Sequence, residues 1–219
     1  MVRAGLTTDR VVEAAADLAD SIGLDRVTVS ALARGFGVKD ASLYSHVRSV
    51  QDLRTRVALL AAGEFADRLG TAVAGRAGKD ALVAFADAYR AFALERPGRY
   101  AATQIRLDPA VVAESTAYHR TIEIIYAMLR AYDLSEPDFT DAVRLLRSTF
   151  HGYSALEANG GFGAPRDVQA SWQQCVEALH LVLERWPSAQ PSGEGGTMDE
   201  RPRTAPAVRN CPERSSTTR

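Results

Sequence analysis

Apolar residues recur every three to four positions along most of the chain, the spacing that places them on one face of an α-helix. Phe85, Tyr89 and Phe92 follow this spacing, and three later stretches, 118–132, 139–153 and 168–186, repeat it. No stretch of useful length alternates between apolar and polar residues as a strand would. The sequence therefore predicts an all-α fold of about nine helices.

Local start and stop signals place these helices along the chain. Thr8 and Gly23 are suited to cap the two ends of the first helix. Pro97-Gly98 ends the fifth helix, Asn159-Gly160-Gly161 separates the last two, and Pro165 can lie early in the last one. We expect helices over residues 8–22, 29–36, 40–47, 50–74, 80–95, 100–106, 109–132, 138–158 (after a Ser135-x-x-Asp138 capping pattern) and 165–186.

Residues 26–53 carry the most specific pattern in the chain. Two short apolar runs, with Val29, Leu32 and Ala33 in the first and Leu43 and Val47 in the second, flank the sequence Gly35-Phe36-Gly37. Two short helices around a glycine-containing turn form a helix-turn-helix, whose second helix enters the major groove of DNA. This segment therefore predicts a protein that reads DNA.

A set of landmarks runs through residues 8–60: Val12-x-Ala14-Ala15, Gly23, Thr28-Val29-x-x-Leu32-Ala33, Gly37-Val38, Ser42-Leu43-Tyr44-Ser45-His46-Val47 and Leu53. This block, from Thr8 to about Leu60, resembles the DNA-binding domain of the TetR family of transcriptional regulators. Two later segments, 89–100 and His151-Gly152 to Gly160-Gly161-Phe162, resemble a C-terminal domain type of that family. The two resemblances together cover roughly residues 8–186.

Composition suggests three parts. With 219 residues and 46% hydrophobic content, the chain can bury one sizeable core or two modest ones. We expect a helix-turn-helix DNA-binding head at residues 1–50 and a helical ligand-binding and dimerisation domain at 51–187. Residues 188–219 are rich in Pro, Gly, Ser, Thr and Arg. Such a tail buries too little apolar surface to offset its ordering entropy, so we expect it to be disordered.

Charge is distributed unevenly between these parts. The net charge of −1 hides a balance of +4 between Arg26 and Arg56, where six basic residues accompany two acidic ones. Residues 57–186 hold 13 basic and 16 acidic residues. Attraction to phosphates requires a local positive surface rather than a basic chain. The uneven distribution favours DNA as a partner, although lopsided helical surfaces are common in soluble proteins.

The residues of the head divide into two expected roles. Thr28 and Ser42 lie at helix N-termini, where hydroxyls cap the helix or contact phosphate. The family resemblance implies backbone contacts for both, and for Tyr44 and His46. Arg48 could replace the lysine usual in the family at Val50. We expect base contacts from Lys39, Asp40, Ala41 and Ser45, although Asp40 departs from many relatives and could instead cap its helix.

The last two predicted helices carry apolar residues outside their main stripe. A second apolar face suggests burial against a partner subunit, and the resemblance implies a four-helix interface between two copies. The alternative is a helix that is central in a single chain. The expected dimer contacts are Leu145, Thr149, Leu156, Val176, Leu179 and Leu183.

The predicted helices of residues 51–187, which we call the body, also carry an aromatic cluster. Buried aromatic residues usually form an ordinary core, but tyrosine hydroxyls need partners when they are buried. The resemblance implies a cavity that binds a small-molecule inducer, which we expect to be flat and mostly apolar. The expected lining is Phe85, Tyr89, Phe92, Tyr100, Gln104, Tyr118, His119, Ile122, Tyr126, Phe150 and His151.

Patterns typical of enzymes and cofactor sites are weak. Gly160-Gly161 lacks the spacing and lysine of a phosphate-binding loop, and the four histidines lie on separate predicted helices. His119 and Glu123 could bind a metal, but a surface pair is the simpler interpretation. We expect no catalytic residue, metal or cofactor. Cys175 and Cys211 lack partners at metal or redox spacing, and no membrane span or leader is evident, which favours the cytoplasm.

The sequence thus predicts a homodimeric repressor that leaves its double-stranded operator when a small molecule binds. Two alternatives stay open at this point. One is a ligand-binding helical dimer whose DNA-binding head has weakened, and the other is an all-α enzyme that uses the body pocket.

Overall fold

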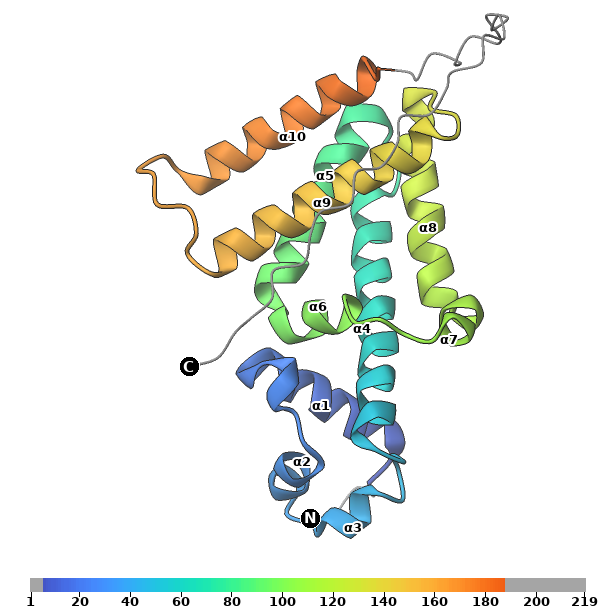
Figure 1. The fold of residues 1–219 in the computed structure, drawn as a ribbon, viewed down its shortest axis with the longest axis vertical. Coiled ribbons are helices and arrows are strands. Elements are labelled where there is room, and N and C mark those ends of the chain that lie inside the picture. The colour runs from blue at the N-terminus through green and yellow to red at the C-terminus, as the bar shows by residue number, and fades with distance from the viewer. Residues whose placement is uncertain (1–5, 188–219) are drawn as a thin grey trace, which may run out of the picture. The chain divides into compact units, whose positions relative to one another are not determined.

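The computed structural model describes residues 6–187, and these residues form ten α-helices and two short 3₁₀ helices without a strand. The predicted all-α class is confirmed, with one helix more than expected (Figure 1). The expected disordered tail, residues 188–219, lies outside the described residues.

The chain begins with three helices and one long helix, followed by six more. The first group is α1 (Thr8–Ile22), η1 (Leu24–Arg26), α2 (Val29–Phe36), α3 (Asp40–Leu43) and α4 (Val50–Val73). The second group is α5 (Gly78–Glu95), α6 (Pro97–Thr103), α7 (Pro109–Glu114), α8 (Thr116–Leu129), η2 (Arg130–Tyr132), α9 (Asp138–Ala158) and α10 (Val168–Glu184).

Four predicted helices had wrong bounds. The sixth spans Pro97–Thr103 instead of 100–106, because Pro97 lies at its start, where its missing N–H and fixed φ favour the first turn of a helix. The third helix ends at Leu43 instead of 47, because residues 44–46 form turns in which the His46 amide bonds to the Leu43 carbonyl at 2.9 Å. The expected helix over 109–132 breaks at Ser115, whose extended backbone (φ −85°, ψ 112°) interrupts the helical ladder. The last helix begins at Val168 rather than near Pro165, since Asp167 accepts a capping hydrogen bond from the Ala170 amide.

The N-terminal cap of α1 also differs from the expectation. Thr7 rather than Thr8 accepts the capping bond, from the amide of Arg10 at 3.3 Å. Gly23 ends the helix as predicted, and its amide donates to the Ala19 carbonyl at 2.8 Å.

Helix α4 contributes to two hydrophobic cores. Its first half packs with α1, α2 and α3 in a head core that includes Leu53 and Val57. Its second half enters the body core with Phe65 and Leu69. The expected domain boundary at residue 50 coincides with the start of α4, but the first half of α4 packs with the head. Residues 6–187 accordingly belong to one compact unit.

The body core is closed by α9 and α10, which lie across α5 (Figure 1). Phe150 and Trp172 are fully buried there, with ring centroids 5.7 Å apart. The indole N–H of Trp172 donates to Asp87 on α5 at 2.7 Å, which satisfies its buried polar group. Arg90 and Glu157 form a further ion pair between α5 and α9 at 2.5 Å.

Candidate nucleic-acid interface and body cavity

The turn between α2 and α3 is built by local sequence. Thr28 caps α2 by accepting from the Ala31 amide at 3.1 Å, which confirms its predicted capping role. Gly37 ends the helix with φ +67°, a left-handed conformation that strains any residue with a Cβ. The next amide, that of Val38, bonds to the Ala33 carbonyl at 3.0 Å. These contacts fix the direction in which α3 leaves the turn.

The α3 segment has a buried side and an exposed side. Leu43 and Val47 are buried in the head core, as the sequence predicted. Tyr44 is 54% exposed, because those two residues already fill the inner side. Lys39, Asp40, Ala41, Ser42, Ser45 and Arg48 are also exposed, and His46 is half-buried. The predicted DNA-contacting residues thus lie around one short segment, apart from Thr28, which caps the N-terminus of α2.

Asp40 does not cap α3. It lies inside the helix, and the N-cap position belongs to Lys39, which makes no side-chain capping bond. The carboxylate of Asp40 instead accepts a hydrogen bond from the hydroxyl of Ser30 on α2. One of its oxygens is therefore engaged in holding α2 and α3 together.

A second local motif connects α3 to α4. Ser49 caps α4 by accepting from the Asp52 amide at 3.0 Å, and Asp52 accepts from the Arg48 amide at 3.0 Å. The Arg48 hydrogen bond lowers the pKa of Asp52; burial opposes that shift, and Arg56 adds to it. The prediction of site residues missed Asp52, although Ser49-x-x-Asp52 is a recognisable capping pattern.

Four exposed basic side chains of the head are available to bind an anion. Within residues 6–187, Arg26, Arg34, Lys39 and Arg48 take part in no ion pair that the structure describes. Arg54 and Arg56 differ, since they pair with acidic residues of the head at 3.8 and 3.1 Å. The unpaired cations supply the local positive surface that phosphate binding requires.

A cavity of about 320 Å³ lies in the body between α4, α5, α6, α8 and α9. Six of the predicted ligand-binding residues line it: Phe85, Tyr89, Gln104, Tyr118, Ile122 and Phe150. The prediction missed ten further lining residues, which are Ala62, Phe65, Leu69, Thr103, Thr121, Ile125, Met128, Val143, Leu146 and Arg147.

The other five predicted ligand-binding residues are absent from the lining. Phe92 packs in the core on Phe65, with centroids 5.0 Å apart. Tyr126 is exposed and stacks on Phe139 at 4.2 Å, and His119 is exposed on the same helix. These positions share the apolar or aromatic spacing of the lining residues but face other surroundings.

The remaining two, Tyr100 and His151, differ in burial: Tyr100 is buried in the core, and His151 is exposed. The Tyr100 hydroxyl bonds to the hydroxyl of Tyr89 at 2.8 Å and to Nδ1 of His151 at 2.7 Å. Burial raises the pKa of Tyr100 well above its ordinary value, and so does the neighbouring Tyr89. Both buried hydroxyls therefore have hydrogen-bond partners. These bonds hold the neutral side chains of Tyr89 and Tyr100 in position.

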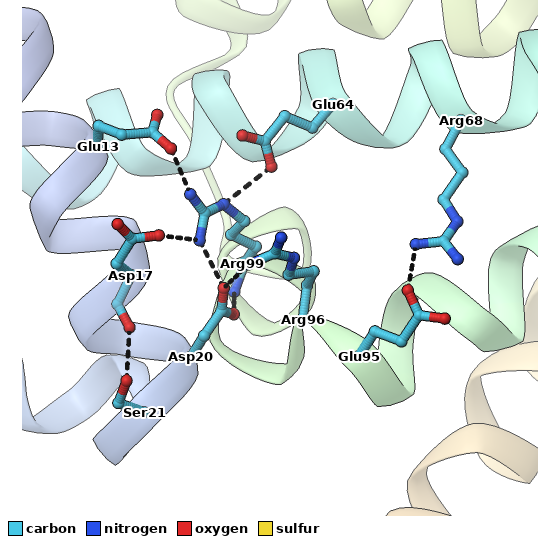
Figure 2. A network of polar contacts seen from close by, with 9 residues as sticks. All are labelled: Glu13, Asp17, Asp20, Ser21, Glu64, Arg68, Glu95, Arg96 and Arg99. Carbon is cyan, nitrogen blue, oxygen red and sulfur yellow. Dashed lines mark hydrogen bonds and ion pairs between the residues drawn. The ribbon is translucent and has the colours of Figure 1, made fainter.

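A buried arginine on α6 joins the head to the body (Figure 2). Arg99 is 3% exposed and forms ion pairs with four carboxylates. Burial lowers the pKa of Arg99, but its contacts with Asp20, Glu64 and Asp17 raise it by more, so it stays charged. The four partners are Glu13 (2.7 Å), Asp17 (3.0 Å) and Asp20 (2.5 Å) on α1, and Glu64 (2.8 Å) on α4.

The neighbouring glycine allows α6 to touch α1 through the backbone. A Cβ at Gly98 would overlap main-chain atoms of Ala19 and Asp20. The Arg99 amide, next along the chain, donates to Asp20 at 2.8 Å. Gly98 is buried, so neither helix can tilt aside without disturbing the core.

The predicted dimer contacts have different surroundings. Val176, Leu179 and Leu183 are buried in the core of the single chain, and Leu145 and Thr149 are half-buried. Leu156, in contrast, is 51% exposed. For Val176, Leu179 and Leu183, the burial agrees with the alternative interpretation, in which the helix face packs inside a single chain. The other exposed large apolar side chains on or beside α9 and α10 are Phe162, Leu181 and Val182.

Within residues 6–187, the structure holds no group of three or more His, Cys, Asp or Glu side chains suited to a metal ion. His119 and Glu123 are both exposed on α8. Burial raises the pKa of the half-buried Cys175, while Cys211 lies outside the described residues. Over the same range, every helix is too short or too polar to cross a membrane.

Comparison with known proteins agrees with this geometry. Residues 82–179 match the family model described as a tetracyclin repressor-like, C-terminal domain. The uncharacterized HTH-type transcriptional regulator YobS of Bacillus subtilis is 33% identical over 77% of this chain and 88% of its own length. The corresponding regulator Rv0681 of Mycobacterium tuberculosis is 35% identical over 83% of this chain and 84% of its own length. The chain belongs to the TetR family of transcriptional regulators.

Solved structures of TetR-family proteins share the fold. A TetR variant from Acinetobacter baumannii, solved in complex with minocycline, aligns with a TM-score of 0.61 at 17% identity. The alignment covers 84% of this chain and all of the other. At such low identity the match concerns the fold alone. This TetR-family chain therefore has the helix-turn-helix head and helical body that its sequence predicted.

Proposed function

We propose that this TetR-family regulator is a homodimeric repressor that binds double-stranded operator DNA in the cytoplasm and is released by a small molecule. The observation that carries the proposal is that α6 touches both functional regions. Thr103 and Gln104, at its C-terminal end, line the cavity, and Arg99 of the same helix pairs with α1 of the head.

The exposed side of the α3 segment supports the DNA-binding mode. Thr28, Ser42, Tyr44, His46 and Arg48 would contact the phosphate backbone and set the orientation of the head. Lys39, Ala41 and Ser45 would lie near base edges, where lysine pairs with guanine and alanine contacts the thymine methyl group. Asp40 would keep its bond to Ser30 and accept from cytosine with its other oxygen.

Dimerisation follows from the geometry of DNA. Two heads must reach half-sites roughly 34–36 Å apart, so the bodies would associate about a two-fold axis. We place this interface on the exposed apolar side chains Leu156, Leu181 and Val182 of α9 and α10. Leu145 and Thr149, which are half-buried, would lie at its margin.

The coupling between ligand and DNA would pass through α6. A ligand shifts an equilibrium only if it binds one conformation better than the other. A molecule in the cavity would press on Thr103 and Gln104, and α6 would transmit the displacement to α1. A TetR variant of the same fold from Acinetobacter baumannii was solved in complex with minocycline, which supports a small molecule as the ligand.

Two measurements test the proposal. The operator is first identified by selecting bound sequences from a random DNA pool, and affinities are then measured by fluorescence anisotropy at several salt concentrations. Tyr44→Ala should weaken binding to all sequences and leave the salt dependence nearly unchanged, because the neutral phenol releases no counterion. Tyr126→Ala is the matched control, because this tyrosine is similarly exposed (51%) but lies on α8. Equal affinities for the two variants would refute the placement of α3 on DNA.

A further inference from the structure

The polarity of the cavity lining changes from one end to the other. Aromatic and aliphatic side chains of α4, α5, α8 and α9 form most of the wall. Among the polar members, Thr103 and Gln104 come from the end of α6, and Tyr118 and Thr121 from the beginning of α8. The hydroxyl of Tyr89 on α5 is bonded to that of Tyr100. The last polar side chain, Arg147 of α9, lies 3.5 Å from the amide oxygen of Gln104. One end of the cavity is therefore apolar and the other is polar.

Arg147 is the single charged residue in this lining. It is exposed, so the polar end opens to solvent beside it. Within residues 6–187, no ion pair of Arg147 with a carboxylate is found. Its neighbour on the same helix, Arg144, differs because it pairs with Asp141 at 3.4 Å. Arg147 therefore presents an uncompensated positive charge to the cavity.

The charge of Arg147 also reaches the tyrosines of the wall. Burial raises the pKa of Tyr89, Tyr100 and Tyr118, and the guanidinium of Arg147 lowers each of them in part. An anionic group placed between the guanidinium and the Tyr118 hydroxyl would gain charge-assisted hydrogen bonds. A cationic group at the same position would meet repulsion without any carboxylate in the lining to offset it.

We infer that the cavity selects a small amphiphile with one carboxylate, which pairs with Arg147 while its apolar chain occupies the space among the aromatic residues. This inference rests on the proposed function, whose ligand class it specifies. The volume of about 320 Å³ lies at the small end of ligand pockets, roughly 300–1,000 Å³. A medium-length acid suits this space better than a large conjugate.

The test compares three molecules that share one chain and differ in their head group. Binding of decanoate, decanol and decylamine to the full chain is measured by isothermal titration calorimetry at pH 7. Decanoate should bind more tightly than decanol by roughly tenfold, the effect expected of hydrogen bonds to a charged partner. Decylamine should bind more weakly than decanol.

Two arginine variants locate the charge. Arg147→Gln should remove the roughly tenfold preference for decanoate over decanol and leave the affinity for decanol unchanged. Arg144→Gln, on the same helix but outside the lining, should preserve that preference. Equal binding of the three molecules to the unaltered chain, or a preference that survives Arg147→Gln, would overturn the inference. Circular dichroism checks that both variants fold.

Operator binding, measured separately by anisotropy, distinguishes a failure of the carboxylate inference from a failure of the proposed function. If decanoate fails to bind while a neutral or cationic compound releases the operator, the carboxylate inference is wrong and the proposed function stands. If the chain binds no operator in any state, the proposed function is wrong, whereas the calorimetric preference for decanoate would still establish the anionic site.

Discussion

Removing the charge of Arg99 should destabilise the chain strongly, and Arg99→Met is the suitable substitution because it retains most of the apolar stem. The four carboxylates around Arg99 would then face one another without a cation. Breaking a buried ion pair by removing one partner costs about 3–5 kcal/mol. That range needs a discount here, since the side chains of Glu13 and Asp17 are 51% and 62% exposed and water screens them.

The less exposed partners determine the remaining cost. The side chain of Asp20 is 12% exposed and that of Glu64 is 35% exposed. We therefore expect Arg99→Met to lower the free energy of unfolding by about 3 kcal/mol, measured by urea denaturation with circular dichroism. Arg68→Met is the control, because Arg68 forms an exposed pair with Glu95 at 2.7 Å (Figure 2). Its loss should stay below about 1 kcal/mol.

The pH dependence of the Arg99→Met defect gives a second criterion. Burial already raises the pKa of Glu64 even though Arg99 is close to it. Without Arg99, protonation of the clustered carboxylates would relieve their repulsion in the folded state. The difference in stability between Arg99→Met and the unaltered chain should therefore be larger at pH 7 than at pH 4.5. A difference that matches that of Arg68→Met, or one that is independent of pH, would refute the electrostatic account.

Three further predictions concern other parts of the chain. Gly98→Ala should lower the melting temperature because its Cβ would overlap the α1 backbone, whereas Gly63→Ala, in open space on α4, should leave it unchanged or raise it. Because the pKa of Asp52 is lowered in the folded state, its carboxylate stabilises the fold at pH values above the ordinary pKa of 3.8. This contribution to stability is lost as the pH falls through the folded-state pKa. Asp52→Asn should therefore reduce the loss of unfolding free energy that occurs on acidification. If the loss is unchanged in this variant, Asp52 does not contribute to it. Leu181→Asp should yield monomers in analytical ultracentrifugation while the helical signal is retained; a dimer that persists would exclude this face.

Local sequence was sufficient to predict α2 and the buried side of the α3 segment, but not the end of α3. The bounds of α2 and the inward positions of Leu43 and Val47 follow from helical spacing and from Gly37, which are properties of neighbouring residues. The break at Ser115 was missed because an extended residue between two apolar helical stretches leaves their spacing almost unchanged.

Contacts between distant elements could not be predicted in this way. A helical stripe identifies the buried face, but it does not say whether that face meets a cavity, a core or a partner. Phe85 and Phe92 belong to one stripe, yet Phe85 lines the cavity and Phe92 lies in the core. The Arg99 cluster joins residues that are up to 86 positions apart, and their carboxylates look like ordinary surface charges in the sequence.

The backbone contact at Gly98 has a mechanical consequence. Two helices joined only by long side chains can slide slightly, because rotation about side-chain bonds absorbs the movement. Where main chain touches main chain, no such soft element lies between them. A small displacement of α6 towards α1 must therefore move α1 as well or open a gap in the core. This junction should transmit such a displacement between the body and the head with little loss.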